Sequence, residues 1–235
     1  MVSRKRVAIL AAVAMLTLHA LAGAQSARQE RAVGGFDQIV WRAGGELRIT
    51  QGPKESLIVE AEPRLLPKLL ADVKGGVLEL RFAEGSFSTT EPIRFHVTVK
   101  TLKSLQANGS GDIVIERLDT PSFGVELVGS GDMRIGQLVT QRLAAKLNGS
   151  SSVELGGGRA TTQTVELKGS GTYDAAAFST EESSVSIGGS GDVKVAASRS
   201  LVARISGSGE IQYVGDPRVV ESVSGSGTVR KIGSR

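Results

Sequence analysis

The sequence predicts an all-β fold, a right-handed parallel β-helix or β-solenoid of about seven rungs with a diverged N-terminal β cap. Three observations predict it: a glycine triplet recurs at nearly constant spacing, aliphatic residues alternate on both sides of it, and 30 glycines accompany only 4% aromatic residues. Each rung, meaning one repeat of 18–20 residues, is expected to be one turn of the stack. The twist of strands and the rule for crossover connections favour the right-handed sense.

The recurring triplet is Gly-Ser-Gly, and in the third copy Gly-Ser-Ser, with successive copies 20, 20, 20, 20, 18 and 18 residues apart. We expect a sharp corner at each triplet, because glycine adopts backbone angles that a side chain disfavours. Ser151 replaces the last glycine of its copy, so that corner is expected to be strained or differently shaped. The first glycines form the predicted turn ladder: Gly109, Gly129, Gly149, Gly169, Gly189, Gly207 and Gly225.

Apolar residues occupy alternate positions before and after each corner, as in a strand that buries one side. Each rung is therefore expected to hold a strand, the corner, a second strand and a looser return of about ten residues. Tyr173 and Tyr213 fall on inward positions, whereas Glu221 and Lys231 break the pattern in the last, open rung. The inward positions four residues after the first glycine are Ile113, Met133, Val153, Tyr173, Val193, Ile211 and Val229.

Residues 35–104 lack the triplet but keep the alternation, so they are expected to form a β-rich capping half for a solenoid of residues 105–235. A solenoid needs atypical ends that hide its apolar stack. Trp41 is expected to anchor this cap, and residues 64–70 to form a short helical turn that Pro67 limits. The strands are expected at 36–40, 46–51, 57–61, 77–82 and 93–99.

Residues 1–24 have the features of a signal peptide: a basic start, an apolar run and Ala22-Gly23-Ala24 as a cleavage signal. Cleavage near Ala24-Gln25 would leave a linker at 25–34 and an exported protein, periplasmic or at the cell surface. No later segment approaches the roughly 20 apolar residues of a membrane span, so no transmembrane segment is expected in the mature chain. The chain has no cysteine, which excludes disulfides.

The charge balance argues against nucleic-acid binding. Removal of the predicted signal leaves 25 basic and 24 acidic side chains, a formal net charge of +1. A nucleic-acid binder would concentrate Lys and Arg on one face, and the sequence shows no such concentration.

The chain resembles the auto-transporter adhesin head GIN domain family across residues 35–230. The resemblance is carried by Phe36-x-x-Ile39, Val77-Leu78-Glu79-Leu80, and Leu102-x-x-Leu105 leading into Gly109-Ser110-Gly111-Asp112. It implies a right-handed β-helix, common in exported bacterial proteins, without an established biochemical activity.

The corners also carry serines and acidic residues that suggest a site. Asp112 with Asp132, and Asp192 with Glu210, are candidate cation or glycan ligands, because acidic groups would stack in neighbouring rungs. The favoured interpretation is turn chemistry, in which Ser and Asp side chains bind turn amides. Calcium is coordinated by six to eight oxygen ligands, more than these positions supply.

Catalytic parts are scarce, so neither catalytic residues nor a cofactor is predicted. His96 is the single histidine after the signal and reads as a solvent-side strand residue. The carboxylate pairs Glu181-Glu182 and Asp174/Glu154 would serve a glycosidase-like enzyme only if they converged.

The leading functional hypothesis is an exported, non-enzymatic binding or adhesion module whose partner is an unknown protein or cell-surface glycan, with possible self-association. The alternatives are a carbohydrate-active enzyme or glycan-binding β-helix, and a structural or accessory protein of the cell envelope that has no ligand.

Overall fold

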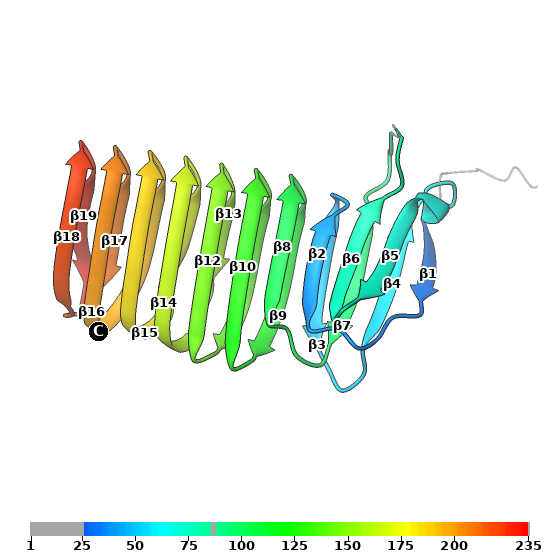
Figure 1. The fold of residues 1–235 in the computed structure, drawn as a ribbon, viewed down its shortest axis with the longest axis horizontal. Coiled ribbons are helices and arrows are strands. Elements are labelled where there is room, and N and C mark those ends of the chain that lie inside the picture. The colour runs from blue at the N-terminus through cyan, green and yellow to red at the C-terminus, as the bar shows by residue number, and fades with distance from the viewer. Residues whose placement is uncertain (1–25, 86–87, 235) are drawn as a thin grey trace, which may run out of the picture.

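The computed structural model describes residues 26–85 and 88–234, and in this part of the chain the regular structure is β apart from one short 3-10 helix. The strands form a flat stack with two walls (Figure 1), which confirms the all-β solenoid. The front strands run toward the glycine corners, and the chain returns behind them while it advances toward the C-terminus. This path winds in the right-handed sense that strand twist favours.

The repetitive part begins with β8 and consists of strands stacked in parallel, in register from rung to rung. Each corner glycine lies opposite the next, as Gly109 does opposite Gly129 and Gly149 opposite Gly169. The seven corners are separated by six turns. Its strands are β8 (Ser104–Gly109), β9 (Asp112–Asp119), β10 (Ser122–Gly129), β11 (Asp132–Val139), β12 (Arg142–Gly149), β13 (Ser152–Leu155), β14 (Gly158–Gly169), β15 (Thr172–Gly189), β16 (Asp192–Gly207), β17 (Glu210–Val214), β18 (Arg218–Gly225) and β19 (Thr228–Gly233).

The first glycine of every triplet has a positive φ, from 119° at Gly225 to 136° at Gly189, as the turn ladder requires. The third position obeys a different restriction, because a Cβ at Gly131 would lie 2.3 Å from the carbonyl oxygen of Gly111. Of the two alternatives expected at Ser151, a strained or a differently shaped corner, strain is not found, because no described non-glycine residue has a positive φ. Ser151 turns its side chain inward, where it is buried. The third position of the triplet is therefore restricted by the space available for a side chain and not by its backbone angle.

The expectation of a loose return is wrong, because the second corner is as tight as the first in the rungs from β9 to β16. β9 and β10 are joined by two residues, Thr120 and Pro121, and β15 passes the second corner without interruption. The threonine hydroxyls hold this bend: Oγ1 of Thr140 donates to the Arg142 carbonyl at 3.1 Å. An inward-facing threonine stabilises the second corner, as glycine permits the first. No recurring glycine marks the second corner in the sequence.

The N-terminal half contains two further parallel rungs before the cap proper. β2 (Gln38–Arg42) and β3 (Glu46–Gln51) lie between β6/β7 and β8/β9, although they precede both pairs in the sequence. Antiparallel strands then close the end, with β5 on β6, β4 on β7 and β1 on β4. The remaining elements are β1 (Ala27–Arg31), β4 (Ser56–Ala61), the 3-10 helix Leu66–Lys68, β5 (Leu69–Lys74), β6 (Val77–Phe82) and β7 (Arg94–Val99).

The predicted linker at 25–34 is wrong in part, because β1 lies within it and pairs with β4 over five residues. The predicted signal peptide lies outside the described residues, which contain no helix long and apolar enough to cross a membrane.

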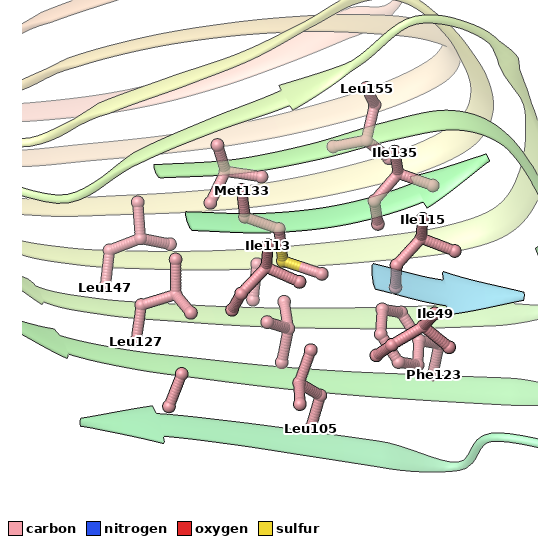
Figure 2. Close-up of a cluster of buried hydrophobic side chains, with 14 of the residues drawn as sticks. Ile49, Leu105, Ile113, Ile115, Phe123, Leu127, Met133, Ile135, Leu147 and Leu155 are labelled. Carbon is pink, nitrogen blue, oxygen red and sulfur yellow. The ribbon is translucent and has the colours of Figure 1, made fainter. Parts of the chain in front are cut away.

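The core is one continuous apolar column between the walls. Figure 2 shows Ile113, Met133 and Ile135 of one wall in the same cluster as Leu127 and Leu147 of the other, all of them buried. The inward positions predicted from the alternation are thereby confirmed for the inner rungs. Tyr213, which was also assigned inward, is only partly buried.

Trp41 packs inside the column where the cap meets the repetitive part, between Leu80 and Ala107, as expected of an anchor. Its side chain is 2% exposed, and a Cβ at Gly111 would lie 2.2 Å from the indole Cη2 atom. The missing side chain of Gly111 therefore makes the space that the indole occupies.

Candidate functional site

The strongest candidate site is a shallow groove of about 490 Å³ on the outer face of the wall that contains β9, β11 and β13. Five of its lining residues are carboxylates and one is an arginine. We call it the acidic groove, and it is lined by Glu46, Asp112, Ile113, Val114, Asp132, Met133, Arg134, Ser152, Val153, Glu154, Thr172 and Asp174.

The repeat itself places these side chains. Residues three and five positions after each first glycine point outward, because strand side chains alternate between the two faces. The parallel register stacks like positions about 4.8 Å apart, so Asp132 lies opposite Ser152, and Ser152 opposite Thr172. Glu46 of β3 extends the same column on the other side of Asp112.

Ion pairs occupy most of the groove's carboxylates. Nη2 of Arg134 lies 2.8 Å from Oε2 of Glu154, and Nζ of Lys194 lies 3.3 Å from Oδ2 of Asp174. Glu46 is bound by Nε of Arg48 at 2.7 Å and by Nε of Arg94 at 3.2 Å.

Asp112 and Asp132 remain, and both are exposed. Their carboxylates have no side-chain hydrogen bond or ion pair within residues 26–85 and 88–234. The structure thus brings these two predicted candidates together as adjacent, uncompensated negative charges.

The other predicted pair is brought to adjacent positions as well, but one member is occupied. Asp192 lies opposite Glu210 in the parallel register. Oε2 of Glu210 accepts from Nε2 of Gln212 at 2.7 Å, and Oε1 accepts from Nε of Arg230 at 3.1 Å. The Gln212 hydrogen bond and Arg230 hold the pKa of Glu210 below its usual value, against the opposing effect of burial. In the described chain, His, Asp and Glu side chains nowhere gather in threes as a metal site would need.

The favoured interpretation of the corner serines as turn chemistry is wrong. The hydroxyls of Ser130 and Ser170 are exposed and make no hydrogen bond among the described residues. Their backbone amides hold the corner instead: the Ser130 amide donates to the Gly109 carbonyl at 3.0 Å, and the Ser170 amide to the Gly149 carbonyl at 3.0 Å. The central serines of the triplets form an exposed ridge whose hydroxyls make no hydrogen bond in the described chain: Ser110, Ser130, Ser150, Ser170, Ser190, Ser208 and Ser226.

Two of the residues weighed for catalysis, Glu154 and Asp174, lie opposite each other in the acidic groove, but each is held in an ion pair, with Arg134 and Lys194 respectively. The others do not converge. Arg199 binds Glu181 at 2.9 Å and lies 3.9 Å from Glu182, so this pair sits in an ordinary surface ion-pair cluster. His96 lies on β7, with Nε2 3.8 Å from Oε2 of Glu60. Neither group faces another that would complete an acid–base pair on a shared substrate.

Sequence reasoning missed a polar contact inside the core. Nε2 of Gln163 donates to the Tyr173 hydroxyl at 2.6 Å, and both side chains are buried. Burial raises the pKa of Tyr173 well above its usual value, and the Gln163 hydrogen bond offsets only part of that effect. The available signal was Gln163 itself, a polar residue in an inward column between Leu143 and Ser183.

Glu62 was also missed, because no motif marks it. Its carboxylate is nearly buried and accepts from the Thr90 amide at 2.8 Å, the Thr89 hydroxyl at 3.0 Å and Nε of Arg64 at 2.7 Å. The Thr90 and Arg64 hydrogen bonds lower the pKa of Glu62 to about 2. Glu62 thereby ties the segment before β7 to the cap.

Comparison with known proteins identifies a matching family and similar solved structures. A family profile described as "Putative auto-transporter adhesin, head GIN domain" matches residues 35–217. A "putative adhesin" from Bacteroides fragilis NCTC 9343 has a similar structure, with 26% sequence identity and a TM-score of 0.85 over 89% of this chain and 98% of that one. A "putative lipid binding protein" from Parabacteroides distasonis ATCC 8503 shares the fold at 24% identity and a TM-score of 0.70, over 88% and 97% of the chains. No curated protein matches the sequence.

Proposed function

We propose, because this chain belongs to the family of auto-transporter adhesin head GIN domains, that it is an exported, non-enzymatic binding module of the adhesion type. Its ligand-binding surface is the acidic groove. Its partner is a cell-surface macromolecule that presents clustered positive charge, either a basic protein segment or a glycan rich in amino sugars.

The observation that carries this proposal is the pair of unpaired carboxylates, Asp112 and Asp132, in the groove. A carboxylate that already has a guanidinium or ammonium partner gains little from a second cation, whereas an unpaired one attracts a cationic group directly. Ser152 and Thr172 continue the column with hydroxyls, which can accept hydrogen bonds from the same ligand. Aromatic rings, on which sugars commonly stack, do not line the groove. Charge is therefore the favoured recognition element.

The test is binding of the purified protein to an array that carries lysine- and arginine-rich peptides, amino-sugar polymers and neutral polysaccharides. Asp112→Asn with Asp132→Asn is expected to reduce binding to the cationic probes by about tenfold or more, since two close charge contacts are lost. Asp192→Asn is the matched control, because Asp192 holds the same position after its corner but lies outside the groove.

Three outcomes contradict the proposal: no binding to any cationic probe, equal losses in the groove and control variants, or cleavage of a polysaccharide. Cleavage would favour the carbohydrate-active enzyme. Absence of any ligand would favour a structural role in the envelope.

A further inference from the structure

The two ends of the solenoid differ in how their last strands are covered. At the N-terminal end, antiparallel strands follow the parallel walls, and β1 carries Arg28, Glu30 and Arg31. At the C-terminal end, β18 pairs with β16 and β19 with β17, and each pairs on one side only among the described strands. Two parallel-stacked edges of eight and six residues therefore lie side by side, and such edges favour pairing with another strand.

The apolar column is uncovered at this end. Val223 is 42% exposed, whereas Ile205, its counterpart in the preceding rung, is 3% exposed. Val219 and Val229 continue the inward columns and are only partly buried. The cross-section of the core thus faces solvent between two unpaired strand edges.

Charged residues also occupy inward positions at this end. No other inward position of the described strands β8 to β19 is charged. Glu221 follows Ala203 in its column, and Lys231 follows Tyr213. Both are five residues from Ser226, the centre of the corner, so they lie at the same height on opposite walls. Lys231 forms an ion pair with Asp216. The side chain of Glu221 makes no hydrogen bond or ion pair in the described chain.

We propose that a second copy of this chain covers the open end, joined tail to tail about a two-fold axis parallel to the strands. β18 of each copy pairs antiparallel with β19 of the other. Because the axis preserves height and exchanges the walls, Glu221 lies over the partner's Lys231, and Val223 over the partner's Val229. Both edges are then paired, and the dimer is closed.

The charges select this axis over the other two-fold arrangement. A two-fold axis perpendicular to the walls would pair β18 with its own copy, so Glu221 would never meet the partner's Lys231 on the opposite wall. In the register centred on Glu221, it would place Glu221 against the partner's Glu221. Like charges placed together at an interface are strongly unfavourable. The selected dimer also turns the two acidic grooves to opposite faces, so one particle could bind two ligands and gain avidity.

Cysteine cross-linking tests the arrangement, because the chain has no cysteine of its own. The variants are Glu221→Cys and Lys231→Cys, with Ser170→Cys as the control at an exposed corner far from the end. A mixture of the first two under mild oxidation is expected to give a covalent dimer, while each variant alone, and the control, gives little. Efficient cross-linking of Glu221→Cys with itself would overturn the proposal.

Sedimentation and charge reversal supply the second measurement. The unmodified protein is expected to sediment as a dimer, and Glu221→Lys to weaken association by about tenfold or more, because two lysines then meet at each contact. Glu221→Lys combined with Lys231→Glu is expected to restore the dimer. A monomer at every concentration, or failure of the double variant to dimerise while its circular dichroism matches wild type, would overturn the proposal.

Discussion

Adding one methyl group at Gly169 is expected to destabilise the fold far more than the same change at a neighbouring strand glycine. Gly169 has a φ of 123°, and a Cβ there would lie 2.2 Å from the Gly149 carbonyl oxygen and 3.0 Å from its carbon. That oxygen cannot move freely, because it accepts from the Ser170 amide at 3.0 Å. The backbone strain alone costs about 1–3 kcal/mol. With the contact added, we expect Gly169→Ala to lower the free energy of unfolding by about 3–5 kcal/mol.

The assay is urea and thermal unfolding followed by circular dichroism, with Gly188→Ala as the control. Gly188 has an ordinary φ, and its Cβ would meet nothing closer than the Lys168 Cγ at 4.0 Å. Replacement there is expected to be neutral or stabilising by up to about 1 kcal/mol. Each 1 kcal/mol corresponds to roughly 2–4 °C for a chain of this length, so Gly169→Ala should lower the Tm by roughly 6–20 °C. Equal Tm values for the two variants would refute the account of the corners.

Three further changes separate surface from core contributions. Ser170→Ala is expected to change the free energy of unfolding by less than about 0.5 kcal/mol, since its exposed hydroxyl binds nothing; a larger loss in urea titration would contradict this. Tyr173→Phe should cost about 1–3 kcal/mol by leaving Gln163 unpaired, and adding Gln163→Leu should recover part of it, measured as a double-mutant cycle; additive losses would argue against the contact. Glu62 has its pKa lowered to about 2, so its carboxylate contributes stability that is complete above its unfolded pKa and lost as pH falls toward 2. Glu62→Gln should therefore be less stable than wild type at pH 7, with the gap closing near pH 2; a gap independent of pH would contradict the assignment.

The repetitive half of the fold was predictable because one physical requirement recurs in it. The turn at Gly109 and its equivalents needs a positive φ, and glycine at a constant period reports that need directly. The family resemblance drawn from the same residues is confirmed by the profile match. The second corner was not predictable in this way, because Thr120 and Thr140 form it with ordinary backbone angles and inward hydroxyls.

The order of the N-terminal rungs was also beyond the sequence pattern. β2 and β3 insert between β6/β7 and β8/β9. Alternation of apolar and polar residues shows that a segment is a strand, but it does not show which strand lies next to it. The groove was half predictable. The period places Asp112 beside Asp132. The ion pair between Arg134 and Glu154 of the next rung, which occupies the Glu154 carboxylate, depends on side-chain packing that the sequence pattern does not show.

The most direct test of the groove's function is a calorimetric titration of an oligolysine peptide into the wild-type protein at low and high salt. If Asp112 and Asp132 recognise positive charge, the affinity should fall steeply between about 0.05 M and 0.5 M salt, because screening shortens the reach of exposed charges. The Asp112→Asn, Asp132→Asn variant should bind weakly at both. Binding that is equally strong in the variant, or indifferent to salt, would contradict the account.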